Sequence, residues 1–265
     1  MKLRGNRRVG SSRLHLLKSG LRVTARYTGG VLREPYLGAR SLRVADETLS
    51  RLKFENRMPI SPLSARVLDA IFSSAYLAPP RSAFVLGNQE IQGLEALVGI
   101  GRLLDAKTVF EIGTYNGTTA WSLGANLPSA TIHTLDLPVS ARPALRFRDV
   151  EDVHRIDFQA RTYDSLQGAR NVHQHFGDSA QFDFSPWHAK CDLIYIDGAH
   201  SLEYVESDTR NALAMASRHS AIVWDDVWHR EPEVLEALMK HPELELFRVP
   251  ETRLVCHFPS GIQRV

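Results

Sequence analysis

Cysteine is scarce in this sequence, and long apolar runs are absent. The 265 residues include two cysteines, Cys191 and Cys256, each in or at the start of an apolar segment typical of a β-strand. We predict two buried thiols, because neither a disulfide framework nor a metal-binding spacing is present. No apolar run approaches the length of a membrane span, and the N-terminus lacks an apolar segment followed by a small-residue cleavage site. These absences argue against a transmembrane or secreted protein, and we expect a cytoplasmic one.

Acidic residues are almost missing from the first 45 positions. Eleven of the 32 Lys and Arg residues lie there, with Glu34 as the single acid, whereas the rest of the chain is acidic. We predict a basic, weakly ordered arm over 1–45. Its leucine-rich stretch 14–21 could form an amphipathic helix that touches an anionic membrane surface or a partner; a solvated tail and an organellar transit peptide are the alternatives. Only Tyr27 and Tyr36 supply aromatic rings, so a role in nucleic-acid binding is not supported.

The usual dinucleotide and phosphate motifs are absent from the most informative stretch, residues 108–119. Dinucleotide sites use G-x-G-x-x-G and P-loops use G-x-x-x-x-G-K-[ST], whereas this stretch has the pattern E-x-G-x-x-x-G. A short apolar strand runs into a turn bracketed by Gly113 and Gly117, and a helix follows. Glycines at these places let the backbone turn tightly and approach a ligand closely.

Two acids frame this turn. Glu111, just before it, would repel a diphosphate but could hold an ammonium group. Asp136 ends the next strand candidate, 131–136, where it could accept hydrogen bonds from ribose hydroxyls. Together these features resemble the S-adenosylmethionine site of class I methyltransferases; an ordinary strand-turn-helix is the alternative.

Strands and helices alternate along the rest of the chain. Ser61-Pro62 resembles an N-cap followed by proline at the first helical position. Further helical patterns occur at 89–104, 201–216 and 231–240, strand patterns at 173–176, 192–197 and 221–224, and a final strand pair at 243–249 and 253–258. We therefore predict an α/β fold with a doubly wound, mostly parallel sheet. The predicted domains are the arm 1–45, a helical extension 46–87 and a cofactor-binding domain 88–265.

Three carboxylates follow two of the apolar strands. Asp197 ends one strand, and Asp225 and Asp226 end the next. Buried acids are costly unless they are paired, hydrogen-bonded or bound to a cation, and oxygen ligands suit Mg²⁺. We predict a metal site formed by these three acids. In the alternative, Asp197 contacts cofactor or substrate and the other two cap the next helix.

Histidines near the strand ends offer a second kind of chemistry. His200 lies three residues after Asp197 and could act as a general base, although a hydrogen-bonded structural role is the alternative. His173 and His175 alternate along one strand. No third ligand is near them in the sequence, so we interpret them as structural. Arg142, Arg146 and Arg148 form a cluster that fits a solvated helical face better than an anion site.

Four sequence blocks resemble the cation-dependent small-molecule O-methyltransferases, in particular the macrolide-sugar branch, with catechol O-methyltransferases more distant. The blocks are Glu111–Gly117, Phe176–Ser179, Ile196–His200 and Trp224–Val227, and the resemblance covers about 88–258. It implies a Rossmann-like fold with a seven-stranded sheet. The second metal block reads Asp-Asp, where catechol enzymes have Asp-Asn, and this favours the sugar branch.

The resemblance also implies a role for each matched residue. Glu111 would bind the methionine ammonium group, Thr119 its carboxylate and Asp136 the ribose. Gly113, Tyr115 and Gly117 would line the cofactor, and Asp178 with Ser179 would contact adenine. Asp197, Asp225 and Asp226 would hold Mg²⁺, with Asp197 also near the cofactor, and His200 would be the base.

The predicted function is methyl transfer from S-adenosylmethionine to a hydroxyl of a small molecule, of sugar or natural-product type. One alternative is a metal-independent N- or C-methyltransferase. Another is a non-catalytic cofactor-binding or membrane-associated protein that acts through the basic arm. A homo-oligomeric state stays open.

Overall fold

The computed structural model of this chain describes residues 49–50, 53–54, 57–75, 88–115, 117–138, 170–228 and 230–261. Contacts divide the chain into two units, Met1–Met58 and Pro59–Val265. In the first unit, residues 49–50, 53–54 and 57 are helical. The predicted basic arm and the arginine cluster at 142–148 lie outside the described residues. The predicted domain boundaries stay predictions.

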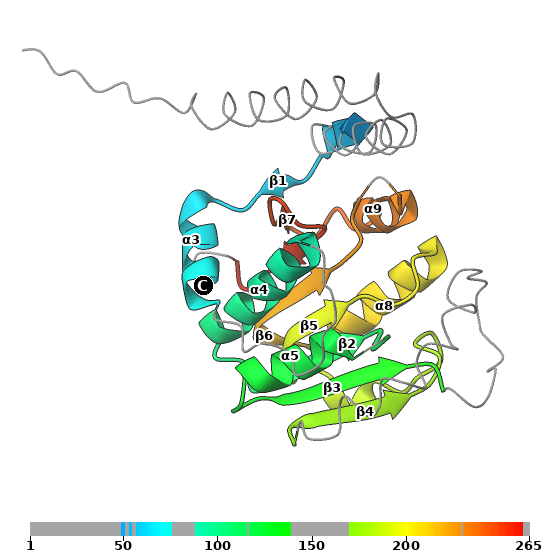
Figure 1. Cartoon of the computed structure of the whole chain (residues 1–265). Coiled ribbons are helices and arrows are strands. Elements are labelled where there is room, and N and C mark those ends of the chain that lie inside the picture. Colours follow the sequence, from blue (N-terminus) through cyan, green and yellow to red (C-terminus); the bar gives the residue numbers. More distant parts are fainter. Residues whose placement is uncertain are drawn as a thin grey trace, which may run out of the picture. The chain divides into compact units, whose positions relative to one another are not determined.

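One sheet of eight strands forms the centre of the second unit (Figure 1), in the order β1-β7-β8-β6-β5-β2-β3-β4. Strand β8 runs antiparallel to β6 and β7, and the other neighbours pair in parallel. The strands are β1 (Ser61–Pro62), β2 (Thr108–Ile112), β3 (Thr131–Asp136), β4 (Val172–Phe176), β5 (Cys191–Ile196), β6 (Ala216–Trp224), β7 (Leu246–Arg248) and β8 (Val255–His257). The mostly parallel α/β fold is therefore confirmed. The sheet has one strand more than the seven expected, because the two-residue β1 pairs with β7.

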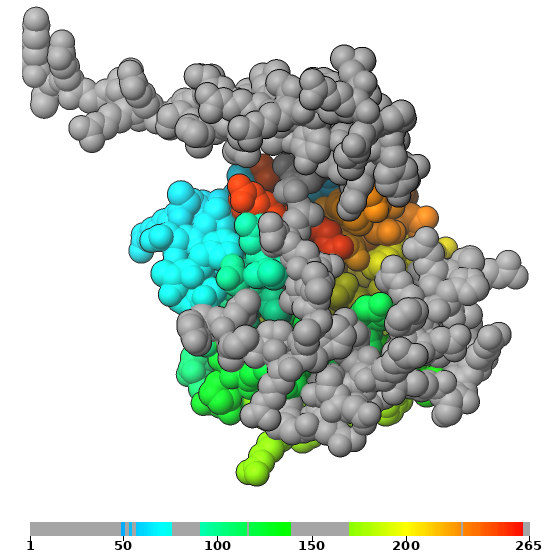
Figure 2. Space-filling view, in the orientation of Figure 1, coloured from blue at the N-terminus to red at the C-terminus, as the bar shows by residue number. Residues whose placement is uncertain are grey.

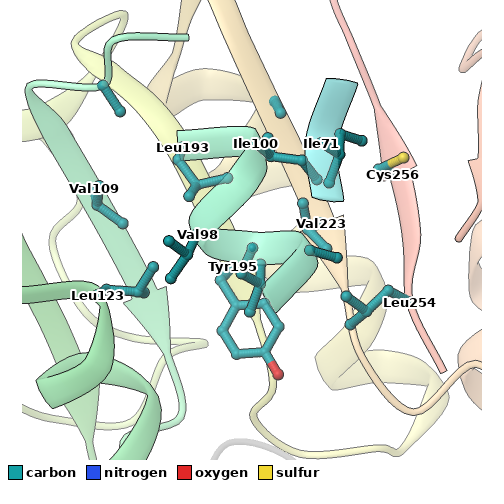
Figure 3. Close-up of a cluster of buried hydrophobic side chains, with 14 of the residues drawn as sticks. Ile71, Val98, Ile100, Val109, Leu123, Leu193, Tyr195, Val223, Leu254 and Cys256 are labelled. Atoms are coloured by element: carbon teal, nitrogen blue, oxygen red, sulfur yellow. The ribbon is translucent and has the colours of Figure 1, made fainter. Parts of the chain in front are cut away.

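Helices pack against the sheet, and the side chains of β5 and β6 contact several of them. Leu193 and Tyr195 lie in a cluster with residues of α3, α4 and α5, including Ile71, Val98 and Leu123 (Figure 3). Ile194 alternates with these residues and is also buried. On β6, Trp224 donates from its indole nitrogen to Thr209 of α8 at 3.0 Å. A strand buried on both faces must be mainly apolar, as β5 is from Leu193 to Ile196. The described helices are α3 (Ala65–Ser74), α4 (Asn88–Leu103), α5 (Thr118–Asn126), α8 (Leu202–Met215), α9 (Pro232–Met239) and the 3₁₀ turn η1 (Ser185–Trp187).

The start of α3 differs from the prediction. Ser61 and Pro62 form β1 instead of a helix N-terminus, and Ser64 caps α3 by accepting a hydrogen bond from the Val67 amide at 3.4 Å. The amide of Leu63 donates to the Arg248 carbonyl at 3.0 Å, so pairing with β7 outweighs the local capping preference. Ile71 of α3 is buried, and the helix forms part of the molecular surface (Figure 2).

Two other sequence predictions, the terminal strand pair and the two buried thiols, are confirmed. The final two runs form the antiparallel pair β7 and β8, with the two-residue strand β1 outside β7 at the edge where we expected the pair itself. Cys191 and Cys256 are both buried and free, and burial raises the pKa of the Cys191 thiol to about 12. Within the described ranges, no helix combines the length and the apolar character that crossing a membrane requires.

Candidate functional site

The predicted site residues lie at one edge of the sheet, where the parallel strands β2 to β6 end. The backbone ladder continues into the loops there. The amide of Gly113 donates to the Leu135 carbonyl at 2.8 Å, and that of Asp197 donates to the Ile112 carbonyl at 2.8 Å. The amide of Asp225 likewise donates to the Ile196 carbonyl at 2.9 Å. The sheet therefore holds the first residue of each loop in register, and binding is expected at this edge of an open α/β sheet.

The turn after β2 requires glycine at its first position. Gly113 has a φ of 100°, and a Cβ added to it would lie 2.0 Å from the carbonyl oxygen of Asp197. This contact places the turn after β2 directly against the turn after β5. Gly117, with a φ of 72°, precedes α5, and Thr119 lies half-buried in the first turn of that helix.

Asp136 holds the same turn from the end of β3. Its carboxylate accepts hydrogen bonds from the amide of Tyr115 at 2.6 Å and from that of Leu137 at 2.7 Å. Tyr115 has a φ of 45°, and its side chain is exposed. The predicted ribose ligand is thus fixed in position by the turn that would line the cofactor.

Glu111 is a buried carboxyl group at the end of β2, with 1% of its surface exposed. The hydroxyl of Thr134 donates to its Oε2, and Oε1 has no hydrogen-bond partner among the described residues. Burial raises the pKa of Glu111 to about 8; the Thr134 hydrogen bond lowers it, and the charge of Asp136 raises it further. An ammonium group at Oε1 would satisfy this carboxylate, as the prediction for Glu111 requires.

Asp178 and Ser179 follow β4 and are tied to α8. The carboxylate of Asp178 accepts hydrogen bonds from the Ala180 amide at 3.0 Å and from the Tyr204 hydroxyl at 3.0 Å. The Ser179 carbonyl accepts a hydrogen bond from Asn211 at 3.4 Å. The structure therefore gives both residues a role in holding this turn, and their contact with adenine stays a prediction.

The three strand-end acids converge around Tyr195 and Arg253. The Tyr195 hydroxyl lies 2.5 Å from Asp225 Oδ2 and 3.1 Å from Asp197 Oδ2. The Arg253 guanidinium contacts Asp225 Oδ1 at 3.3 Å and Asp226 Oδ1 at 2.7 Å. Burial and the neighbouring charges of Asp225 and Asp226 raise the pKa of Asp197 well above its usual range. A cation in this cluster would stabilise the ionised carboxylates and so lower the raised pKa of Asp197.

His200 lies beside Asp226 and Glu231. Its Nε2 is 3.0 Å from Asp226 Oδ2, and its Nδ1 is 3.8 Å from Glu231 Oε2. One ligand atom each from Asp197, His200 and Asp226 lies within 4.8 Å of the others. These three residues can therefore hold a metal ion together; the predicted group of Asp197, Asp225 and Asp226 stays a prediction.

Sequence reasoning missed Tyr195, Glu231 and Arg253. The position of Tyr195, two residues before Asp197 in the strand predicted at 192–197, could have indicated that both side chains share one face. Glu231, at the start of α9, and Arg253, between β7 and β8, approach the acids only through the tertiary fold.

The histidines of β3 and β4 belong to one aromatic cluster. His133 Nδ1 lies 3.1 Å from His175 Nε2, and both rings pack edge-on against Trp187. Burial and neighbouring histidines lower the pKa of His133 to about 4. Over the described part of the chain, these histidines do not form a metal group of three. The interpretation of His173 and His175 as structural stays a prediction.

Comparisons with known proteins concern this same region. A family model described as a methyltransferase domain matches residues 110–227. The fold is similar to that of the S-adenosylhomocysteine (SAH)-bound Podospora anserina methyltransferase PaMTH1, with 17% identity over 76% of this chain and 97% of that chain and a TM-score of 0.50. No curated protein sequence matches this chain.

Two further solved structures resemble the chain at lower TM-scores. CalS11, a TDP-rhamnose 3'-O-methyltransferase in calicheamicin biosynthesis, has 14% identity over 82% of this chain and 95% of that chain, with a TM-score of 0.48. TomG from Streptomyces achromogenes, an O-methyltransferase involved in tomaymycin synthesis, has 16% identity over 80% of this chain and 96% of that chain, with a TM-score of 0.47. The domain match and the fold shared with PaMTH1 agree with each other.

Proposed function

We propose that this chain, which is a methyltransferase of the class I fold, transfers the methyl group of S-adenosylmethionine to a hydroxyl of a small molecule, of sugar or natural-product type, with the help of a divalent cation. The observation that carries the proposal is the contact between Gly113 and the Asp197 carbonyl, where an added Cβ would lie 2.0 Å away. Because of this contact, the turn after β2, which would hold the cofactor, lies against the turn that carries Asp197. A sulfonium donor and a cation-bound acceptor would then share one pocket.

The residues around the turn fit the donor. Glu111 offers a buried carboxylate oxygen to an ammonium group, and Asp136 stands at the end of β3 for the ribose. Gly113, Tyr115 and Gly117 would line the cofactor through their backbone, with Thr119 at its carboxylate. Asp178 and Ser179 would border the adenine from the end of β4.

The acid cluster fits a divalent cation. Asp197 and Asp226 bring carboxylate oxygens together with His200, while Asp225 is the third acid of the predicted set. When bound, a divalent cation lowers the pKa of a coordinated hydroxyl and fixes its direction. The chain's own side chains then have to orient the acceptor and exclude water.

Two roles are open to His200, and the methyl-transfer proposal stands with either. As the predicted base, it would take the acceptor's proton, and the carboxylates of Asp226 and Glu231 beside its two ring nitrogens would stabilise the imidazolium. As a ligand, it would direct Nε2 to the cation. A cytoplasmic location and membrane contact through residues 1–45 stay predictions.

The test is calorimetry of S-adenosylmethionine and its demethylated product with the full chain, followed by a screen of hydroxylated acceptors with and without EDTA. We expect donor binding, and hydroxyl methylation that EDTA abolishes reversibly. Asp105→Asn, a change at an exposed acid paired with Lys107, is the matched control for Asp197→Asn and should keep wild-type turnover. Full activity in EDTA, or methylation at nitrogen or carbon, would favour the metal-independent alternative. Absence of donor binding would favour the non-catalytic one.

A further inference from the structure

We infer that the cation ligands of this chain are Asp197, His200 and Asp226, that Asp225 is not a ligand, and that the site prefers a transition ion such as Mn²⁺ or Zn²⁺ to Mg²⁺. The inference deepens the proposed function and rests on it, because it concerns the same pocket. Compared with the predicted ligands, the inferred set contains His200 in place of Asp225.

The carboxylate of Asp225 already contacts three neighbouring donors. Its Oδ2 accepts from the Tyr195 hydroxyl at 2.5 Å. Its Oδ1 accepts from the Asp226 amide at 2.6 Å and lies 3.3 Å from Arg253 Nε. These three contacts fill Oδ1 and leave one lone pair on Oδ2, where an ion would have to compete with the 2.5 Å hydrogen bond from Tyr195.

Asp226 is held in the opposite way, with one oxygen anchored and the other directed at the cluster. Its backbone lies in the left-handed region, with a φ of 56°. Arg253 Nη1 holds Oδ1 at 2.7 Å, and Oδ2 faces His200 Nε2 at 3.0 Å. The side chain of Arg253 also lies over the Trp228 ring, 5.4 Å from its centroid, which restricts the guanidinium. Arg253 is therefore a positioning residue for Asp226.

His200 has the environment of a metal ligand. One of its ring nitrogens belongs to the group of ligand atoms that lie within 4.8 Å of one another. Its Nε2 lies 3.0 Å from Asp226 Oδ2, and Glu231 lies on its Nδ1 side at 3.8 Å. A histidine ligand typically directs its second ring nitrogen at a carboxylate, which selects the tautomer and increases the basicity of the ligating nitrogen. A ring used in this way has no nitrogen left for the acceptor's proton, so the base role falls away in this inference.

The donor types decide the class of ion. Two carboxylates balance a divalent charge, while Arg253 offsets the third acid, Asp225. An imidazole nitrogen suits Zn²⁺ or Fe²⁺, and carboxylates suit Mn²⁺, whereas Mg²⁺ prefers oxygen ligands and keeps several waters. The sequence block Asp197-Gly-Ala-His200 places the imidazole in the same turn as the first acid.

The experiment is a Mn²⁺ titration of the full chain followed by pulsed electron paramagnetic resonance. We expect ¹⁴N modulation from a bound imidazole, which should disappear when the histidines carry ¹⁵N. Mn²⁺ should bind more tightly than Mg²⁺ in competition calorimetry, because Mg²⁺ gives up its waters reluctantly and prefers oxygen ligands. Absence of ¹⁴N modulation, or tighter binding of Mg²⁺ than of Mn²⁺, would overturn the inference. Both measurements use the wild-type chain alone.

Variants then separate the ligands. His200→Gln should remove the ¹⁴N modulation, whereas Asp225→Asn should retain it. Circular dichroism verifies that each variant folds. Loss of Mn²⁺ binding in folded Asp225→Asn, with the signal kept in His200→Gln, would contradict the assignment. Donor binding is measured separately, so a chain that binds Mn²⁺ through His200 but not S-adenosylmethionine would refute the proposed function alone.

Discussion

Glu111→Gln should stabilise the ligand-free protein while weakening its affinity for the donor. Glu111 is buried, and its pKa is raised from 4.5 to about 8, mainly by burial. Between these two values the unfolded chain ionises Glu111 whereas the folded chain keeps it protonated. The stability that this group contributes is therefore fully present below pH 4.5 and is lost as the pH rises towards 8.

The magnitude follows from the same linkage. Each step of one pH unit in that window costs about 1.4 kcal/mol, so the loss at pH 7 is about 3 kcal/mol. Glutamine is neutral at every pH and can keep the hydrogen bond from Thr134. We expect Glu111→Gln to be more stable than the wild type by about 2–3 kcal/mol at pH 7 and about equally stable near pH 4.5.

The donor should show the opposite effect. An ammonium group at the open Oε1 requires an ionised carboxylate, so donor binding at pH 7 should release about one proton from Glu111. Losing a charge-assisted hydrogen bond costs about 2 kcal/mol, and Glu111→Gln should bind S-adenosylmethionine about thirtyfold more weakly.

The assays are urea unfolding at several pH values and calorimetry in buffers of different ionisation enthalpy. Glu251→Gln, at an exposed glutamate between β7 and β8, is the control and should change neither quantity. A Glu111→Gln variant that keeps the wild-type pH slope of stability would refute the argument from burial. Wild-type donor affinity in that variant would refute the role of Glu111.

Three further predictions concern the turn, the histidines and the acids. Gly113→Ala should destabilise the chain by about 3 kcal/mol or more and abolish donor binding, because the added Cβ would lie 2.0 Å from a carbonyl oxygen. Gly261→Ala is the control, because Gly261 also has a positive φ, 77°, but an added Cβ would have no atom within 4 Å. Its free energy of unfolding in urea should fall by only about 1 kcal/mol, the cost of the backbone conformation. His133 has its pKa lowered to about 4, so its contribution to stability should fall by about 1–2 kcal/mol, after allowance for solvent screening, as the pH drops from 6.5 towards 4. His133→Phe should reduce that slope in thermal unfolding, and an unchanged slope would contradict the cause. Asp197→Asn should leave the fold intact by circular dichroism and abolish turnover in the acceptor screen; a variant with wild-type turnover would remove Asp197 from the site.

Short-range patterns were sufficient for most of the fold. Apolar strands alternating with helices predicted the parallel sheet, and residues that follow parallel strands must meet at one edge. This is why Glu111, Asp136, Asp197 and Asp225 lie together although they are far apart in the sequence. The local signal failed at Ser61-Pro62, where a capping pattern competed with pairing to β7 and lost.

The sequence by itself determined that a glycine turn and several acids meet where the strands end, because strand direction and side-chain alternation are local properties. Only the tertiary structure decided how the acids are used. Tyr195 and Arg253 engage Asp225, and His200 faces Asp226 and Glu231. Such pairings depend on the distances and directions of side chains from separate elements, and no periodicity in the chain encodes them.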